Sequence, residues 1–147
     1  MMTKQMETGT SLKEIKELLF TETNFMKEFG YDRIVEHEDS FHYALSYLSL
    51  KNEKAVEFEI DLREPACFVL ITQLEDKKLP EGYYMNNGKR VRIHLEKYLD
   101  NKNINPEILH GIIEIRRNNK GDSIDIIGLQ IRAYAVLLKE NIGLIDS

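Results

Sequence analysis

The chain has 147 residues, 42% hydrophobic and 31% charged, with a formal net charge of −5 at pH 7. This length suits one domain around one core, so we expect residues 1–147 to form a single domain with a flexible N-terminus of about residues 1–10. The sequence has no long apolar run and its first ten residues are polar, so we expect neither a membrane span nor a secretory signal. The single cysteine, Cys67, excludes an internal disulfide. We therefore expect a cytoplasmic protein without membrane contact.

A helix is predicted over residues 12–28. Ser11 and Glu14 have the spacing of a capping box, and apolar residues recur at helical period from Leu12 onward. Gly30 follows at a position where helices commonly end.

Four strands are predicted next, as an antiparallel meander. They cover residues 31–37, 41–50, 54–62 and 67–74. The last of these is apolar on both faces, so we expect a helix to cover its second face.

The second and third predicted strands are expected to form a hairpin. A two-residue turn at 52–53 sets Tyr47 opposite Phe58 and Ser46 opposite Glu59. In this register every large apolar side chain meets another one on the same face of the sheet.

The rest of the chain is predicted to be mainly helical. Residues 75–88 form a loop with Tyr83 and Tyr84 on a short exposed ribbon, and residues 91–99 form a short strand that runs into a helix. Two further helices are predicted over 107–117 and 123–140. This order predicts an α+β fold with the C-terminal helices packed on one face of the sheet.

Residues 54–62 are the most informative stretch of the chain. Apolar residues alternate with Glu57, Glu59 and Asp61, so the strand has one apolar face and one acidic face. Carboxylates at alternate positions are roughly 6.6 Å apart and repel one another, and stability alone does not require them. We predict a docking surface for a basic partner, with a solvated strand face as the alternative. The surface is predicted to extend to Glu36, Glu38 and Asp39.

The distribution of charge supports a basic protein partner. Residues 1–88 contain 10 Lys and Arg against 17 Asp and Glu, a net charge of −7, whereas residues 89–147 contain 10 against 8, a net charge of +2. Nucleic-acid binders neutralise phosphates with basic side chains, so the acidic first part argues against nucleic acid. It favours steered encounter with a cationic protein surface.

The segment 36–42 is the only cluster with ingredients for catalysis or metal binding. Its spacing matches no known metal-ligand pattern, so a solvated turn is the favoured explanation, with an interaction surface as the alternative and a metal site after both. A small hydrolase using His37, Glu38 and His42 is a third hypothesis. The chain contains no Gly-rich phosphate loop or nucleophile motif, and we expect a protein that is not an enzyme and uses no metal or cofactor.

Three blocks of the sequence suggest a family. Residues 56–74 (VEFEIDLREPACFVLITQL), 79–84 (LPEGYY) and 89–94 (KRVRIH) resemble small immunity proteins, or antitoxins, of Bacillus-like bacteria. Those are encoded beside LXG-type polymorphic toxins, whose C-terminal domains are often ribonucleases. The resemblance implies a chain that binds and neutralises a cognate toxin, a nuclease by expectation, and it assigns no catalytic residue. Carboxylates can occupy the basic cleft that a nuclease offers to phosphates.

An alternative function is a non-catalytic adaptor or regulatory module. It would bind a host protein through Tyr83, Tyr84 and the neighbouring loop, because tyrosine is favoured at interface hot spots. Both functions leave the oligomeric state open.

Overall fold

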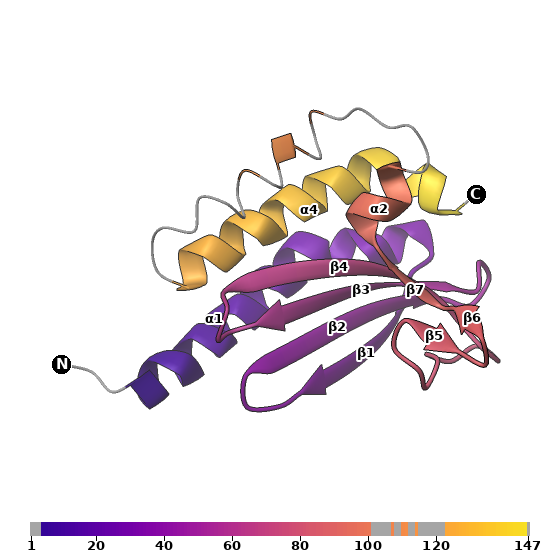
Figure 1. Ribbon diagram of the computed structural model, residues 1–147. Coiled ribbons are helices and arrows are strands. Elements are labelled where there is room, and N and C mark those ends of the chain that lie inside the picture. Colours follow the sequence, from indigo (N-terminus) through magenta and orange to yellow (C-terminus); the bar gives the residue numbers. More distant parts are fainter. Residues whose placement is uncertain (1–3, 101–106, 108–109, 112–113, 115–122, 147) are drawn as a thin grey trace.

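The structure is a computed structural model that describes residues 4–100, 107, 110–111, 114 and 123–146. It has an N-terminal helix, a five-stranded antiparallel sheet and C-terminal helical segments packed on that sheet (Figure 1). The predicted α+β fold is therefore confirmed. The helix predicted over 107–117 falls mostly outside the described residues.

Helix α1 spans Lys4–Thr23 and continues as a 3-10 helix, η1, over Asn24–Phe29. It begins before the predicted start at Leu12. Gly30 ends η1 with a φ of 93°, a left-handed conformation that costs glycine little. Its N–H donates to the carbonyl oxygen of Lys27.

The sheet has the order β1-β2-β3-β4-β7. Short turns join the first four strands, which is why neighbours in sequence are antiparallel neighbours in space. The predicted meander is confirmed, and the short strand expected after residue 90 adds a fifth member. The strands are β1 (Arg33–Glu38), β2 (His42–Ser49), β3 (Lys54–Asp61), β4 (Ala66–Gln73) and β7 (Arg92–His94).

The register between β2 and β3 differs from the predicted one by two residues. Ser49 lies opposite Lys54 and Ser46 opposite Glu57, so the loop covers residues 50–53 and the predicted two-residue turn is wrong. A shift of two leaves every side chain on its predicted face. The apolar pattern therefore could not distinguish the two registers.

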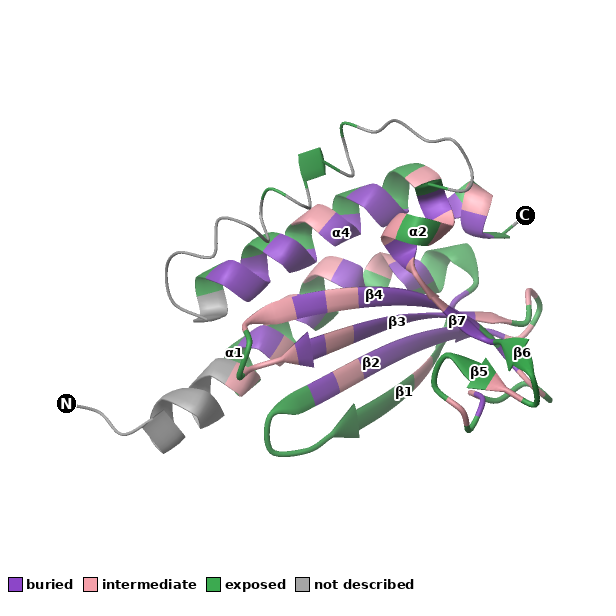
Figure 2. Ribbon diagram, viewed as in Figure 1, coloured by how far each residue is buried: buried purple, intermediate pink, exposed green. Residues whose placement is uncertain are grey.

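The main core lies between one face of the sheet and the helices α1, α2 (Leu95–Asp100) and α4 (Ser123–Asp146). Figure 2 shows the buried residues gathered along strands β2 to β4 and along α4. Tyr47 and Phe58 meet edge to face in this core, with ring centroids 6.0 Å apart. None of the helices in the described ranges combines the length and apolar character needed to cross a membrane.

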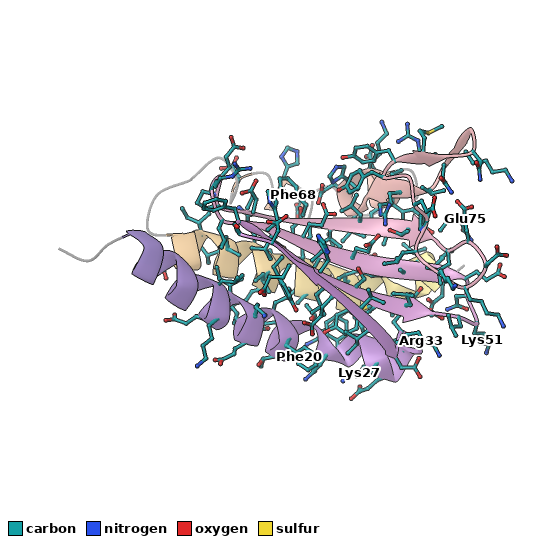
Figure 3. All side chains as sticks on the ribbon, turned by 90° about the horizontal axis from the view of Figure 1, so that it is seen from below. Phe20, Lys27, Arg33, Lys51, Phe68 and Glu75 are labelled. Atoms are coloured by element: carbon teal, nitrogen blue, oxygen red, sulfur yellow. The ribbon has the colours of Figure 1, made fainter. Side chains whose placement is uncertain are left out.

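Residues 74–91, which we call the flap, cover part of the opposite face of the sheet. The flap contains the hairpin of β5 (Met85–Asn86) and β6 (Lys89–Arg90), and Figure 3 shows it on the side away from α1 and α4. Leu74 and Leu79 pack there in a second apolar cluster with Leu48 and Ala55. The sequence predicts a helix over this side of β4. That prediction is wrong, because the flap supplies the cover.

Candidate binding site on the open sheet face

The sheet face opposite the helices is only partly covered by the flap. We call the remaining part the open face, and Figure 3 shows Phe68 on this side of the sheet. The alternation of side chains along the strands places acidic and apolar groups together here. Its exposed or half-exposed apolar and acidic residues are Val35, Ala44, Glu59, Asp61 and Phe68 from the sheet and Tyr83 and Tyr84 from the flap. The same face also carries Arg33, His37, His42 and His94.

Glu57 does not belong to the accessible surface, because it is buried at 4% exposure. Its Oε2 accepts a hydrogen bond from Ser46 Oγ at 2.8 Å. Its Oε1 accepts from Thr72 Oγ1 and from Arg92 Nε, the latter at 2.6 Å. The prediction of Glu57 as an exposed docking carboxylate is wrong: the chain's own Arg92 neutralises it beneath the flap.

Arg92 connects this buried carboxylate to the flap. One of its terminal nitrogens donates to the carbonyl oxygens of Gly82 at 2.8 Å and Tyr83 at 2.9 Å. Its guanidinium also lies 5.2 Å from the centre of the Tyr83 ring, within range of a cation–π interaction. The Glu57–Arg92 pair therefore positions the flap backbone, and with it the tyrosines of the open face.

Glu59 is the carboxylate of the predicted row that lies at the boundary of sheet and flap. It is half-buried, and Tyr83 donates its hydroxyl proton to Glu59 Oε1 at 2.5 Å. Desolvation raises the pKa of Glu59, the hydrogen bond from Tyr83 opposes that rise, and the neighbouring Glu57 adds to it. The hydrogen bond from Tyr83 thus holds Glu59 in place, and the nearby Arg92 and His94 also favour its charged form.

Asp61 and Asp39 lie at the end of the sheet, on either side of His42. Asp61 Oδ2 is 3.5 Å from His42 Nε2, and Asp39 Oδ1 is 3.4 Å from His42 Nδ1. Each aspartate also caps a turn by accepting from the backbone N–H groups two and three residues further on. Backbone hydrogen bonds lower the pKa of Asp39. Both carboxylates keep solvent access on this corner.

Glu36 and Glu38 lie on the helix side of β1. They pair with Leu45 and Tyr43 of β2, whose side chains enter the main core. Their predicted continuity with the acidic row of β3 is therefore wrong, because side chains on the two faces of a strand alternate. Their predicted role in partner binding stays a prediction.

Tyr83 and Tyr84 form a fixed aromatic pair. Their side chains are 43% and 41% exposed, and their ring centroids are 4.5 Å apart. Tyr84 forms a hydrogen bond with His94 through its hydroxyl, 2.9 Å from Nε2. Held hydroxyls and exposed rings give a surface that loses little conformational entropy on binding. The expected exposure of this ribbon is confirmed.

The third hypothesis required His37, Glu38 and His42 to act together. His37 pairs with Ala44 and projects to the open-face side of β1, whereas Glu38 projects to the helix side. Among the described residues, no group of three or more His, Cys, Asp or Glu side chains could hold a metal ion. These three residues are not brought together as one site.

Sequence reasoning missed three contributors to the site: Arg92, His94 and Phe68. Alternation along residues 92–94 puts Arg92 and His94 on one face of β7, opposite Thr72 and Leu70 of β4. That alternation was visible in the sequence as Arg-Ile-His. The partner strand was not visible, because β4 and β7 are separated by the whole flap.

Comparison of the chain with protein-family models, curated proteins and solved structures finds no match.

Proposed function

We propose that this chain is a binding protein that neutralises a cognate protein toxin by docking a basic surface of the toxin on the open face. The observation that carries the proposal is the contiguity of the Glu59 carboxylate with the exposed Tyr83–Tyr84 pair. Asp61 adds a second carboxylate to the same face. This combination supplies both aromatic contact area and negative charge.

The two kinds of group would act at different stages of association. Carboxylates on an acidic chain attract a cationic partner over distances near the Debye length and raise the association rate. The tyrosine rings contribute buried area once the partner is seated. A nuclease toxin suits this surface, because its phosphate-binding cleft is basic and can accept carboxylates.

The test uses the protein encoded beside this chain as the candidate toxin, with association followed at low and high salt. The double variant Glu59→Gln with Asp61→Asn removes two charges but keeps the acceptor oxygens for Tyr83 and for the turn. We expect association about tenfold slower at low salt and less dependent on salt.

The matched control is Glu28→Gln with Asp32→Asn. These exposed carboxylates lie outside the open face, and their loss changes the net charge equally. We expect the control to associate nearly as fast as the unmodified chain. Equal slowing in both double variants, or none in either, overturns the assignment of the open face.

An adaptor that binds a host protein is the second candidate. It is favoured by Met85, which is 50% exposed beside the two tyrosines and gives the flap the adaptable character of promiscuous surfaces. In that case Tyr83→Ala with Tyr84→Ala abolishes partner capture, whereas the Glu59→Gln, Asp61→Asn variant retains it. The toxin proposal requires both variants to lose affinity.

A further inference from the structure

Strand β1 is an edge of the sheet, and its outer side is available for pairing. It hydrogen-bonds only to β2 in the strand order. The N–H of Asp39 donates to the carbonyl of His42 at 2.9 Å. Asp39 and His42 are therefore a hydrogen-bonded pair of the antiparallel ladder. Hydrogen-bonded pairs alternate along such a ladder, so the N–H and C=O groups of Ile34, Glu36 and Glu38 point away from β2. Within the described part of the chain, no backbone outside the sheet bonds to them.

A shallow groove, largely open to solvent, lies beside this edge on the helix side. It has a volume of about 360 Å³ and lies between α1 and the strands β1 and β2. Figure 3 shows the molecule from the β1 side, with Phe20 labelled on α1 and Arg33 labelled on β1. An added strand would place alternate side chains over this groove. The groove is lined by Lys16, Glu17, Phe20, Thr21, Glu36 and Tyr43.

The groove already accommodates one ammonium group at its wall. Lys16 Nζ is 2.7 Å from Glu38 Oε1 and 5.1 Å from the centre of the Tyr43 ring. Among the described residues, Glu17 and Glu36 form no close ion pair. The hydrogen bond to Glu38 nevertheless raises the pKa of the Lys16 ammonium, and the negative charge of Glu36 adds to that rise. The ammonium group of Lys27 also lies 5.0 Å from the centre of the Phe20 ring, which is 37% exposed. The three carboxylates of Glu17, Glu36 and Glu38 therefore outnumber the two lysines, Lys16 and Lys27, by one negative charge.

We propose that the β1 edge binds an extended segment of a basic polypeptide as a sixth strand, with one Lys or Arg side chain of that segment entering the groove between α1 and β1. The aliphatic stem of this side chain packs on Phe20, and its cationic end meets Glu17 and Glu36. Backbone hydrogen bonds at the edge hold the segment, while the groove selects its charge. This surface is separate from the open face and does not depend on the toxin proposal.

Charge also argues against a second copy of this chain as the occupant. Antiparallel pairing of two β1 strands would bring Glu36 and Glu38 of the copies onto the same face of the joined sheet. Like charges at facing positions destabilise a strand pair. Acidic residues on an edge also protect the free chain from self-association.

The probe is the synthetic peptide acetyl-Thr-Val-Lys-Val-Lys-Val-Thr-amide, with a matched peptide in which Glu replaces both Lys. We expect only the basic peptide to bind. Its binding should slow hydrogen exchange at the amides of Ile34, Glu36 and Glu38 by about tenfold or more. Two further peptides carry N-methyl groups on the odd-numbered or on the even-numbered residues. Only one of them should lose binding, because only one of the two sets of amides faces β1.

Two variants of one residue separate charge from backbone. Glu36→Thr removes the carboxylate and keeps the N–H, and we expect about tenfold weaker binding. Glu36→Pro also removes the outward N–H without breaking the β1–β2 ladder, and we expect binding to be lost. If Glu36→Pro does not fold, the N-methylated peptides test the same hydrogen bonds on the unmodified chain.

Three results overturn the proposal. Binding of the basic peptide without amide protection in β1 would show a purely electrostatic contact. Equal binding of the acidic peptide would remove the role of the groove. A concentration-dependent dimer in sedimentation, with the same β1 amides protected, would make a second copy the occupant.

Discussion

Arg92 and Glu57 form the buried ion pair on which the arrangement of the flap depends. Their side chains are 8% and 5% exposed, with 2.6 Å between Arg92 Nε and Glu57 Oε1. A buried pair gains little over an apolar replacement of both partners, but loss of one partner leaves a charge with no compensation. The pair is therefore a source of geometric specificity more than of net stability.

We predict that Arg92→Met lowers the free energy of unfolding by about 3–5 kcal/mol, measured by urea denaturation. The double variant Arg92→Met with Glu57→Gln should be less destabilised than Arg92→Met alone, because no unpaired charge remains. Arg90→Met is the control, since Arg90 is exposed on the neighbouring strand. Equal stability of the Arg90 and Arg92 variants would contradict this account.

The alternation of residues 54–62 correctly predicted which side chains share a face of β3, because that depends only on strand geometry. It could not predict that Glu57 is buried and Glu59 half-buried. Their environment is set by the flap and by Arg92, which lies 35 residues after Glu57 in the sequence. The local pattern of apolar and polar residues contains no information about a segment that lies so far along the chain and covers the strand.

At the scale of elements, the flap depends on a close backbone contact at Gly82. A Cβ atom built on Gly82 would lie 1.9 Å from the carbonyl oxygen of Met85. The carbonyl of Gly82 is also one of the two that Arg92 binds. A side chain here would therefore displace the segment that carries Tyr83 and Tyr84.

We predict that Gly82→Ala destabilises the protein by about 1–3 kcal/mol, the range expected for overpacking, and disorders the flap. Gly143→Ala in α4 is the control, because nothing lies within 4 Å of a Cβ there. Alanine in a helix should raise stability by about 0.5–1 kcal/mol. Thermal unfolding measures both effects, and the amide spectrum of residues 82–90 reports on the flap. A Gly82→Ala protein with unchanged flap resonances would refute the steric argument.

The hairpin of β2 and β3 shows a second limit of prediction, at the level of elements. Their existence and facing were predictable from period-two alternation. The register was not predictable, because after a slip of two residues apolar side chains still lie opposite apolar side chains. The four-residue loop is selected by contacts from elsewhere: Leu74 donates its N–H to the carbonyl of Glu53, whose φ is 55°.

At the scale of the whole molecule, the C-terminal end of α4 is bonded to several distant elements. Tyr31 donates its hydroxyl proton to Asp146 Oδ1 at 2.7 Å, and Asn52 donates to the same oxygen at 3.1 Å. Lys54 Nζ donates to the carbonyl oxygen of Ile145 at 2.7 Å. These bonds connect the start of the sheet, the β2–β3 hairpin and the last helix.

The tyrosines of this framework make the stability of the whole protein sensitive to alkaline pH. Burial raises the pKa of Tyr31, Tyr43 and Tyr83, and hydrogen bonds or nearby charges of Asp146, Glu36 and Glu59 raise each further. In the unfolded chain these phenols ionise near their ordinary pKa of 10.0. The folded state holds their protons more tightly, so its stability is fully present below pH 10 and falls as pH rises above that value.

We predict that tyrosinate absorbance from these groups appears together with the loss of far-ultraviolet circular dichroism on alkaline titration, because the folded state resists their ionisation. Tyr43→Phe removes one group with a raised pKa, so the stability of this variant should fall less steeply above pH 10. The variant keeps the aromatic ring under the Lys16 ammonium but loses the hydroxyl that interacts with Glu36. Its stability at pH 7 therefore provides the baseline from which the slope is measured. Complete tyrosine ionisation at pH 10 with intact circular dichroism would contradict the burial of Tyr31 and Tyr43, and with it the packing of the sheet against α1 and α4.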